Sequence, residues 1–284
     1  MLDDARTRGL ITVDLGAGAA GYFTTRTAPD APAAEGGPYA GFNLALHVGD
    51  DAARVVGHRN RLARALGVGS GPAAAAGGDD LSRAGIAWMN QVHSTSVAAA
   101  RADAAPTADA LLLDTRAADP GHADSRPRAS ARPGPAAAAV LVADCVPLLL
   151  AGADGAVVAA VHVGRRGLLA GIVPAVLDAL RVAGVDPAGV CAAIGPAICG
   201  ACYEVPEQLH DDAAAIEPVC AVTTRWGTPG IDLAAGVTAQ LRRAGVRHVT
   251  DVQRCTYEDD GLYSYRRDGV TGRQAGVVVP APRR

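Results

Sequence analysis

Three side chains in this sequence have the chemistry to hold a soft metal ion. Cys145 and His162 stand towards opposite ends of one apolar segment, VLVADCVPLLLAGADGAVVAAVHVG, and His93 lies upstream in WMNQVHS. Thiolate and imidazole are ligands that zinc prefers. A lone cysteine or histidine in an apolar strand is more often a core or hydrogen-bonded structural residue. The chemistry therefore depends on whether the fold brings these side chains together.

The apolar segment predicts a buried β-hairpin, because two Val/Leu-rich runs are separated by the turn signal Ala153-Asp154-Gly155. With the turn centred between Ala153 and Asp154, Cys145 and His162 are directly opposed. Opposed residues have Cβ atoms roughly 4.5–5.5 Å apart, so the pair could share one metal ion or act as a nucleophile and its base. A turn centre displaced by one residue would weaken this pairing. Asp144 points to the other face of a regular strand, unless Pro147 distorts that strand. It is then a supporting partner of the site, a proton-transfer group or a solvated acid at the strand end.

Composition narrows the class of protein. The chain has 284 residues, 49% hydrophobic and 19% charged, with a net charge of −3. This balance predicts neither a nucleic-acid partner nor a membrane surface. The start, MLDDARTRGLITVDLG, lacks the pattern of a secretory signal, so we expect a cytoplasmic protein. Six cysteines without such a signal do not predict a disulfide framework.

Lysine is absent, so all 26 basic residues are arginine. This excludes Schiff-base chemistry and a P-loop lysine. A substrate anion must then be held by arginine or by backbone N–H groups. Arg26, Arg166 and Arg266 are the candidates, with surface ion pairing as an equally weighted alternative.

The mix of strands and helices without strict βαβ repetition predicts an α+β fold and favours a single domain. Residues 116–139 are expected to be a mobile insertion, because they are rich in Pro, Arg and Ala, and residues 281–284 a tail. The other expected segments are strands at 10–15, 21–25, 86–100 (carrying His93), 190–196 and 247–255, helices at 47–68, 167–185, 206–216 and 233–244, and loops at 27–41 and 73–83.

Several sharper motifs lose their usual meaning in context. LGAGAAG has dinucleotide-binding spacing, but GYFTTR predicts a strand where a helix is required, which favours a glycine hairpin turn. Cys199 and Cys202 form a CxxC without an apparent second ligand pair, so ordinary thiols are favoured. Neither HExxH nor the nucleobase-deaminase signature occurs. No HxH occurs among the seven histidines, which disfavours a multicopper oxidase.

Several longer motifs occur together and in order. They are FTTR, GFNLALHVGDD, NQVHS, ADCVPLLL, HVGRRGL, IGPAICGACYEV and CTYEDDGLYSYRRDGVTGRQAG. Together they resemble the YfiH-type laccase-domain family, also called the polyphenol oxidase or multifunctional purine nucleoside phosphorylase family. The resemblance runs from about Tyr22 to Val278. It implies one α+β domain of sandwiched mixed and antiparallel sheets flanked by helices, in α/β/β/α layers.

The resemblance also implies a metal site formed by His93, Cys145 and His162, holding zinc, with copper as the alternative. The implied activity is phosphorolysis of adenosine, inosine, guanosine and methylthioadenosine, with adenosine deamination as a side reaction. Purine nucleoside and phosphate are then the partners, and Cys145 and Asp144 the catalytic residues. The predicted substrate-binding residues are Arg26, Asn43, Arg166 and Arg266. We expect a monomer or weak homodimer.

One departure lies beside the metal motif. The usual HAGWRG is HVGRRG here, so Val163 replaces Ala and Arg165 replaces Trp. Losing a flat apolar side chain and gaining a charge predicts a shifted substrate preference. A Cys–His hydrolase, a copper-dependent phenol oxidase and a non-catalytic metal-binding or redox protein remain as alternatives.

Overall fold

The computed structural model describes residues 9–29, 36–68, 85–116 and 134–282. Its strands form a five-stranded sheet, a six-stranded sheet and a separate two-stranded ribbon. The five-stranded sheet contains, in spatial order, β1 (Leu10–Asp14), β2 (Ala20–Thr24), β13 (Gln274–Val279), β6 (Ala137–Val142) and β3 (Ile86–Ala87). The six-stranded sheet contains β12 (His248–Asp251), β9 (Cys191–Ile194), β7 (Val146–Ala151), β8 (Val157–Val163), β5 (Ala110–Asp114) and β4 (Val97–Ala99).

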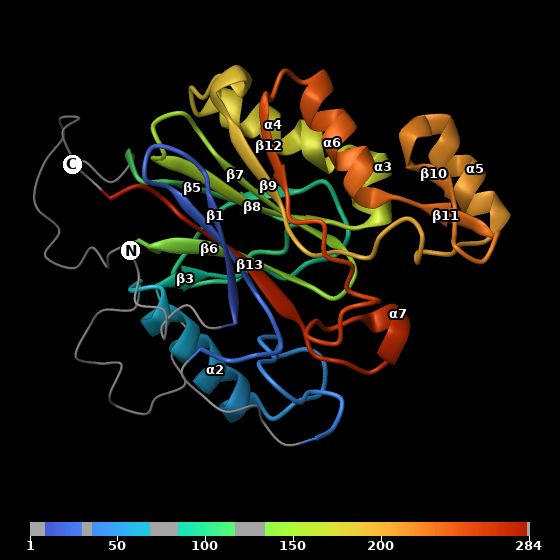
Figure 1. Cartoon of the computed structure of the whole chain (residues 1–284). Helices are drawn as coiled ribbons and strands as arrows, with labels where there is room; N and C mark the ends of the chain where they lie inside the picture. Colours follow the sequence, from blue (N-terminus) through green and yellow to red (C-terminus); the bar gives the residue numbers. More distant parts are fainter. Residues whose placement is uncertain (1–8, 30–35, 69–84, 117–133, 283–284) are drawn as a thin grey trace, which may run out of the picture.

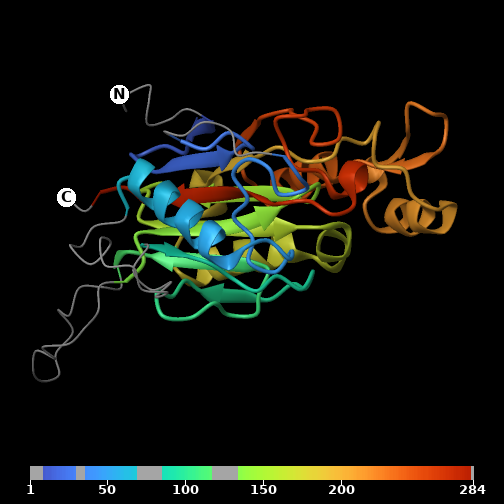
Figure 2. The ribbon, with the colours of Figure 1, turned by 90° about the horizontal axis from the view of Figure 1, so that it is seen from below.

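The two sheets pack face to face, and helices cover their outer faces (Figure 1). One apolar cluster lies between the sheets, with contributions from Phe23, Val140, Leu149 and Ala160. A second lies between the six-stranded sheet and helices α3 (Arg165–Ala170), α4 (Ile172–Val182) and α6 (Leu233–Arg243). A third lies between the five-stranded sheet and α2 (Ala52–Ala65). Figure 2 shows α2 lying across its sheet. The predicted α+β fold with sandwiched sheets between helices is confirmed.

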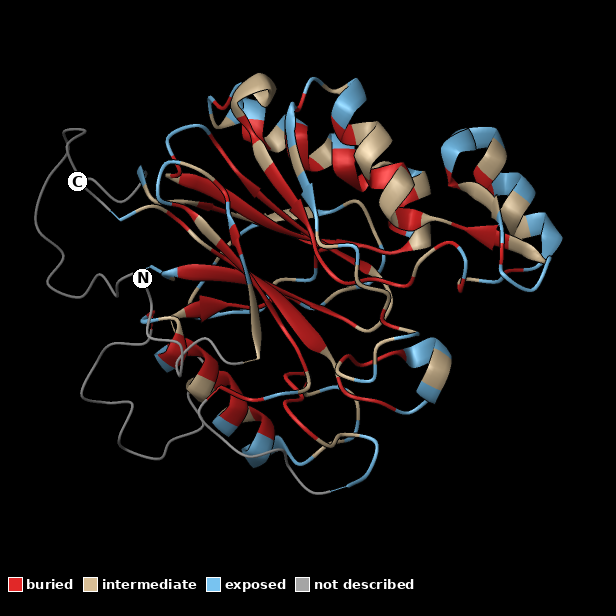
Figure 3. Ribbon diagram, viewed as in Figure 1, coloured by how far each residue is buried: buried red, intermediate tan, exposed pale blue. Residues whose placement is uncertain are grey.

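This layering explains the continuous apolar runs. All residues of β7 and β8 are buried, because one face of their sheet meets the second sheet and the other meets helices (Figure 3). A smaller part projects from the sandwich and contains α5 (Glu207–Ile216), β10 (Ala221–Thr223) and β11 (Pro229–Ile231) (Figure 1). In the described part of the chain, no helix is long and apolar enough to cross a membrane.

The hairpin exists, but its predicted register is wrong. His162 lies opposite Pro147, and Val163 lies opposite Val146. The turn is centred one residue later than expected, with Gly155 in the left-handed region (φ 67°) and donating its N–H to the Gly152 carbonyl. Cys145 precedes β7, in the bend where the chain passes from β6 in one sheet to β7 in the other. The ligand pair therefore does not arise from a directly opposed strand pair.

Other element predictions also need correction. The expected strand at residues 86–100 is two short strands, and His93 lies in the loop between β3 and β4. The expected helix at 167–185 breaks at Gly171, whose φ of 95° is outside the helical region. The predicted insertion ends earlier, since β6 begins at Ala137. Residues 117–133, the loop predicted at 73–83 and the last two residues of the tail lie outside the described part.

Several predictions at the ends of the chain can be checked as well. The glycine turn after β1 is confirmed, because β1 and β2 pair antiparallel and Gly16 and Gly18 have positive φ. Strands β5 and β13 and the short helix α7 (Tyr265–Asp268) were not predicted from the sequence.

Candidate metal centre and adjoining pocket

The three ligand candidates converge from separate segments. His93 comes from the β3–β4 loop, Cys145 from the bend before β7, and His162 from within β8. Their ligand atoms all lie within 4.8 Å of one another. Cys145 Sγ is 3.8 Å from His93 Nε2, and the two imidazole rings meet edge to face with centroids 4.6 Å apart. The predicted trio is thus brought together by long-range packing.

A fully buried carboxylate, Asp109, orients two of these segments. Its Oδ1 lies 2.8 Å from His162 Nδ1, and its two oxygens also accept the backbone N–H groups of Val92, His93 and Ser94. Burial raises the pKa of Asp109, but hydrogen bonds from His162 and Ser94 outweigh it and hold that pKa well below its usual range. Asp109 therefore fixes the His162 ring and leaves its Nε2 available.

Backbone strain marks the same place. His93 has φ 60° and Asp144 has φ 96°, both in the left-handed region that non-glycine residues rarely adopt. Such a conformation costs on the order of 1–3 kcal/mol and persists where surrounding contacts enforce it. For His93 those contacts are the hydrogen bonds to Asp109. For Asp144 they are hydrogen bonds from Thr256 Oγ1 and the Arg266 N–H, each at 2.6 Å.

Because Gly164 has no side chain, His93 and Cys145 can pack directly against its backbone. A Cβ added there would lie 2.6 Å from His93 Cδ2 and 3.2 Å from Cys145 Sγ. Gly164 also precedes the first turn of α3. A side chain at this position would displace the ligands.

The electrostatics favour an ionised thiol. Burial raises the pKa of Cys145, but the neighbouring His162 outweighs it and lowers that pKa to about 6. Burial lowers the pKa of His162, but Cys145 and Asp109 outweigh it and raise that pKa to about 9. The thiolate is the form of cysteine that binds metal or attacks as a nucleophile.

The three residues fit a zinc ion. In a tetrahedral site with bonds of about 2.0–2.3 Å, a thiolate and an imidazole nitrogen lie roughly 3.5 Å apart, close to the 3.8 Å between Cys145 and His93. Asp109 supplies the carboxylate–histidine support typical of metal sites. Two imidazoles and one thiolate are also compatible with copper.

A pocket of about 300 Å³ opens beside the trio. His93 and Cys145 form part of its wall, together with Asp144, two tyrosines (Tyr203 and Tyr265) and three arginines (Arg165, Arg166 and Arg266). Arg266 donates to the Glu204 carbonyl, and its guanidinium lies 5.1 Å from the centre of the Tyr203 ring. The pocket thus combines metal ligands, aromatic rings and an excess of positive charge.

A family model described as multi-copper polyphenol oxidoreductase laccase matches residues 21–281. The chain belongs to this family. The predicted resemblance to YfiH is confirmed by its relatives. The purine nucleoside phosphorylase of Streptomyces coelicolor is 42% identical over 245 residues, which cover 85% of this chain and 88% of that protein. The purine nucleoside phosphorylase YfiH of Shigella flexneri is 30% identical over 246 residues, covering 85% and 87%.

Solved structures agree with the fold. A Neisseria meningitidis protein assigned to the family model DUF152 superimposes with a TM-score of 0.75 and 29% identity, covering 96% of this chain and all of that one. The description of the family names an oxidase, whereas these two bacterial relatives are named phosphorylases.

Two predicted substrate-binding residues lie away from the pocket lining. Asn43 is fully buried, and its amide holds Ala45, Asp50 and the Arg273 N–H by hydrogen bonds. Arg26 lies over the Tyr263 ring, with 4.9 Å between its guanidinium carbon and the ring centre, and donates to the Ala40 carbonyl. Through these contacts both residues stabilise the loops around them. Arg166 and Arg266, by contrast, line the pocket.

The two residues that depart from the usual family motif differ in place. Val163 is buried in β8, so its extra methyl groups affect packing. Arg165 lines the pocket and interacts electrostatically with Tyr203. Only Arg165 is placed to change what the pocket binds.

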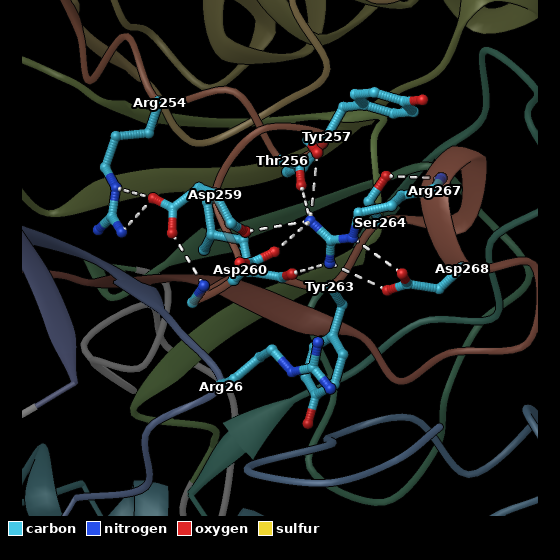
Figure 4. A network of polar contacts seen from close by, with 12 residues as sticks. Arg26, Arg254, Thr256, Tyr257, Asp259, Asp260, Tyr263, Ser264, Arg267 and Asp268 are labelled. Atoms are coloured by element: carbon cyan, nitrogen blue, oxygen red, sulfur yellow. Dashed lines mark hydrogen bonds and ion pairs between the residues drawn. The ribbon is translucent and has the colours of Figure 1, made fainter. Parts of the chain in front are cut away.

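Arg267 organises the loop behind the pocket and was not predicted. Its guanidinium donates to the backbone carbonyls of Thr256, Tyr257, Asp259 and Leu262 and pairs with Asp268 (Figure 4). This cradle holds Thr256, which contacts Asp144 on the pocket wall. Unlike Asp109, Arg267 acts within one stretch of the chain, from Thr256 to Asp268, and its only sequence signal is its place in the motif SYRRDG.

Proposed function

We propose that this protein is a zinc-dependent purine nucleoside phosphorylase acting on adenosine, inosine, guanosine and methylthioadenosine, with adenosine deamination as a side reaction. One observation carries the proposal: a single pocket joins the His93–Cys145–His162 trio to arginines and tyrosine rings. Its volume of about 300 Å³ lies at the lower end of the roughly 300–1,000 Å³ typical of small-molecule sites. The names of the bacterial relatives support the same activity.

The side chains that line the pocket have distinct proposed roles in this reaction. Arg166 and Arg266 are the proposed phosphate ligands, because guanidinium groups bind phosphate oxygens bidentately. The Tyr203 and Tyr265 rings offer faces for a purine. Asp144 is the proposed proton-transfer group, held in place by Thr256 and Arg266. A zinc ion held by the trio would supply Lewis-acid polarisation.

Product analysis tests this function. Purified protein is incubated with adenosine in the presence and absence of phosphate. Phosphorolysis gives adenine and ribose 1-phosphate only with phosphate, whereas deamination gives inosine and ammonia in either case. Cys145→Ala should abolish turnover. Cys191→Ala, at another half-buried cysteine in β9, is the matched control and should retain it. Absence of any purine nucleoside turnover by the zinc-loaded protein would exclude the proposal.

A Cys–His hydrolase is the second candidate, because the lowered pKa of Cys145 and raised pKa of His162 describe a thiolate–imidazolium pair, the form that an activated cysteine nucleophile takes. Chelation separates the two. Activity that survives complete metal removal would support the hydrolase, and activity restored by zinc would support the phosphorylase. Oxidation of phenols restored by copper alone would support the oxidase.

We propose further that the chain is one domain, a monomer or weak homodimer, and cytoplasmic. The shared apolar clusters between the sheets and helices support a single folding unit. A single cooperative unfolding transition and light scattering over a range of concentrations test the first two points.

A further inference from the structure

A second group of metal-ligand side chains lies outside the trio. Cys199, Cys202, Cys255 and Glu258 place their ligand atoms within 4.8 Å of one another. We call these four residues the thiol cluster. The CxxC at 199–202 thus does have partners, but they lie more than fifty residues later in the chain. The expectation that Cys199 and Cys202 are ordinary thiols rested on the absence of such partners.

The backbone holds the two halves of the thiol cluster together. Ala197 and Cys255 form a parallel β-bridge, and the Thr256 N–H donates to the Ala197 carbonyl at 3.0 Å. The Cys199 N–H points at Cys255 Sγ, 3.4 Å away, and Cys199 Sγ lies 3.9 Å from Glu258 Oε2. A tetrahedral zinc ion with Zn–S bonds of about 2.3 Å separates its thiolates by roughly 3.8 Å. Small side-chain rotations would therefore close the cluster around an ion.

The charges of the cluster favour a divalent cation. Three thiolates and a carboxylate brought this close together would repel one another, and a divalent cation between them removes that repulsion. Arg225 Nη2 lies 2.8 Å from Cys202 Sγ and 2.6 Å from Glu258 Oε1, where its charge offsets the negative charge that three thiolates and a carboxylate leave around a divalent ion.

We propose that Cys199, Cys202, Cys255 and Glu258 form a second zinc site with a structural role. Binding replaces three thiol protons by one Zn²⁺ and releases those protons, with no change in oxidation state. Four protein ligands leave no open position, as is typical of structural zinc. Thiolate ligands also select a soft or borderline ion over magnesium or calcium.

The two segments that carry the thiol cluster also supply or contact the wall of the pocket. Ile198 and Tyr203, which flank the CxxC, line the pocket. Thr256 follows Cys255 and donates to Asp144. A bound ion would fix these segments relative to each other. The proposal is independent of the reaction catalysed in the pocket.

Metal analysis of the full-length protein, purified under reducing conditions and dialysed against trace zinc, tests the proposal. Wild type should hold two zinc ions per chain, one for each cluster. Cys145→Ala and Cys255→Ser should each lose one, the double variant should lose both, and the control Cys191→Ser should lose none. Equal zinc content in wild type and Cys255→Ser would overturn the proposal.

Cobalt substitution gives a second test that does not require Cys255→Ser to fold. Cys145→Ala, which keeps the thiol cluster but not the trio, should bind one Co²⁺ and show intense thiolate-to-cobalt absorption. The bound Co²⁺ should also quench the fluorescence of Trp226. The Trp226 ring contacts Tyr257, which lies between Cys255 and Glu258 in the chain. Adding Glu258→Gln should weaken that binding several-fold. Absence of cobalt–thiolate absorption in Cys145→Ala would overturn the proposal. So would a metal-replete protein whose mass is lower by two hydrogens, because it would contain a disulfide among the cluster cysteines.

Discussion

The trio and the thiol cluster use similar atoms in opposite ways. The trio has three candidate ligands, a buried carboxylate behind His162 and a pocket in front of His93 and Cys145. The thiol cluster has four candidate ligands on two loops, with Arg225 against its outer side. Three protein ligands leave a position for water or substrate, whereas four fill the shell of zinc. We therefore propose that reactivity belongs to the trio and that the thiol cluster holds loops.

The supports differ as well. The trio is anchored partly in a buried sheet, since His162 lies within β8 and Asp109 immediately precedes β5. The thiol cluster depends on loops whose shape comes from the Ala197–Cys255 bridge and the Arg267 cradle. Sheet strands fix atoms more rigidly than loops do. A bound ion would add more order to the thiol cluster than to the trio.

Removing the thiolate of the trio should have the largest effect. Cys145→Ala leaves two imidazoles, so we expect loss of the pocket metal and a fall in nucleoside turnover on the order of 10³-fold or more, equivalent to several kcal/mol of transition-state stabilisation. Steady-state kinetics and zinc content check this together. Retained turnover with lost zinc would contradict the proposed role of the trio.

Crowding the trio without removing a ligand should have a smaller effect. In Gly164→Ala the new Cβ meets His93 at 2.6 Å, and misplacement by about 1 Å costs roughly 10²-fold in rate. Gly57→Ala is the control, because a Cβ there has open space within α2 and should stabilise the helix by about 0.5–1 kcal/mol. Thermal unfolding and kinetics of both variants test the contrast, and equal kinetics would show that the close approach at Gly164 is unimportant.

The sequence predicts ligand identities better than it predicts their geometry. His93, Cys145 and His162 could be chosen by residue type and motif, and the apolar runs predict buried strands. The predicted hairpin register is wrong because moving the centre of the turn by one residue shifts the partner of every strand residue by two positions. Cys145 was placed in that hairpin, yet it lies where the chain crosses between sheets, which no local periodicity reveals.

Residues that support the sites were missed for a related reason. Asp109 binds the loop of His93, many positions earlier, and a strand that follows much later. Cys255 and Glu258 join Cys199 and Cys202 only after β9 and the 255–258 loop come together. Such partners are set by tertiary packing, so spacing in the sequence carries little information about them.

The carboxylate behind His162 allows the trio to be perturbed from outside. Asp109→Asn keeps the shape of the side chain but replaces one oxygen by an N–H₂ group. That group would face backbone N–H donors whose hydrogen bonds the carboxylate accepts, so these hydrogen bonds would be lost. Loss of such a supporting partner lowers metal affinity by about 10–100-fold. Competition with a chelator measures the zinc affinity of the pocket site. Unchanged affinity would mean that Asp109 stabilises the fold without tuning the metal. Zinc in the thiol cluster should be unaffected, which distinguishes a local effect from unfolding.

The smallest effect on turnover is expected at the thiol cluster. Glu258→Gln keeps the side-chain length and removes its charge, so it weakens the fourth ligand and the pair with Arg225. That exposed pair contributes only about 0–1 kcal/mol to stability, so any larger fall in unfolding temperature must come from lost metal. Glu207→Gln, at an exposed glutamate in the first turn of α5, is the matched control.

We expect the unfolding temperature of the zinc-loaded protein to drop in Glu258→Gln. Turnover should change less than about threefold, because Asp144 and the trio keep their own contacts. A loss of turnover as large as that of Cys145→Ala would place Glu258 with the reacting groups and remove the division between a reactive and a structural site.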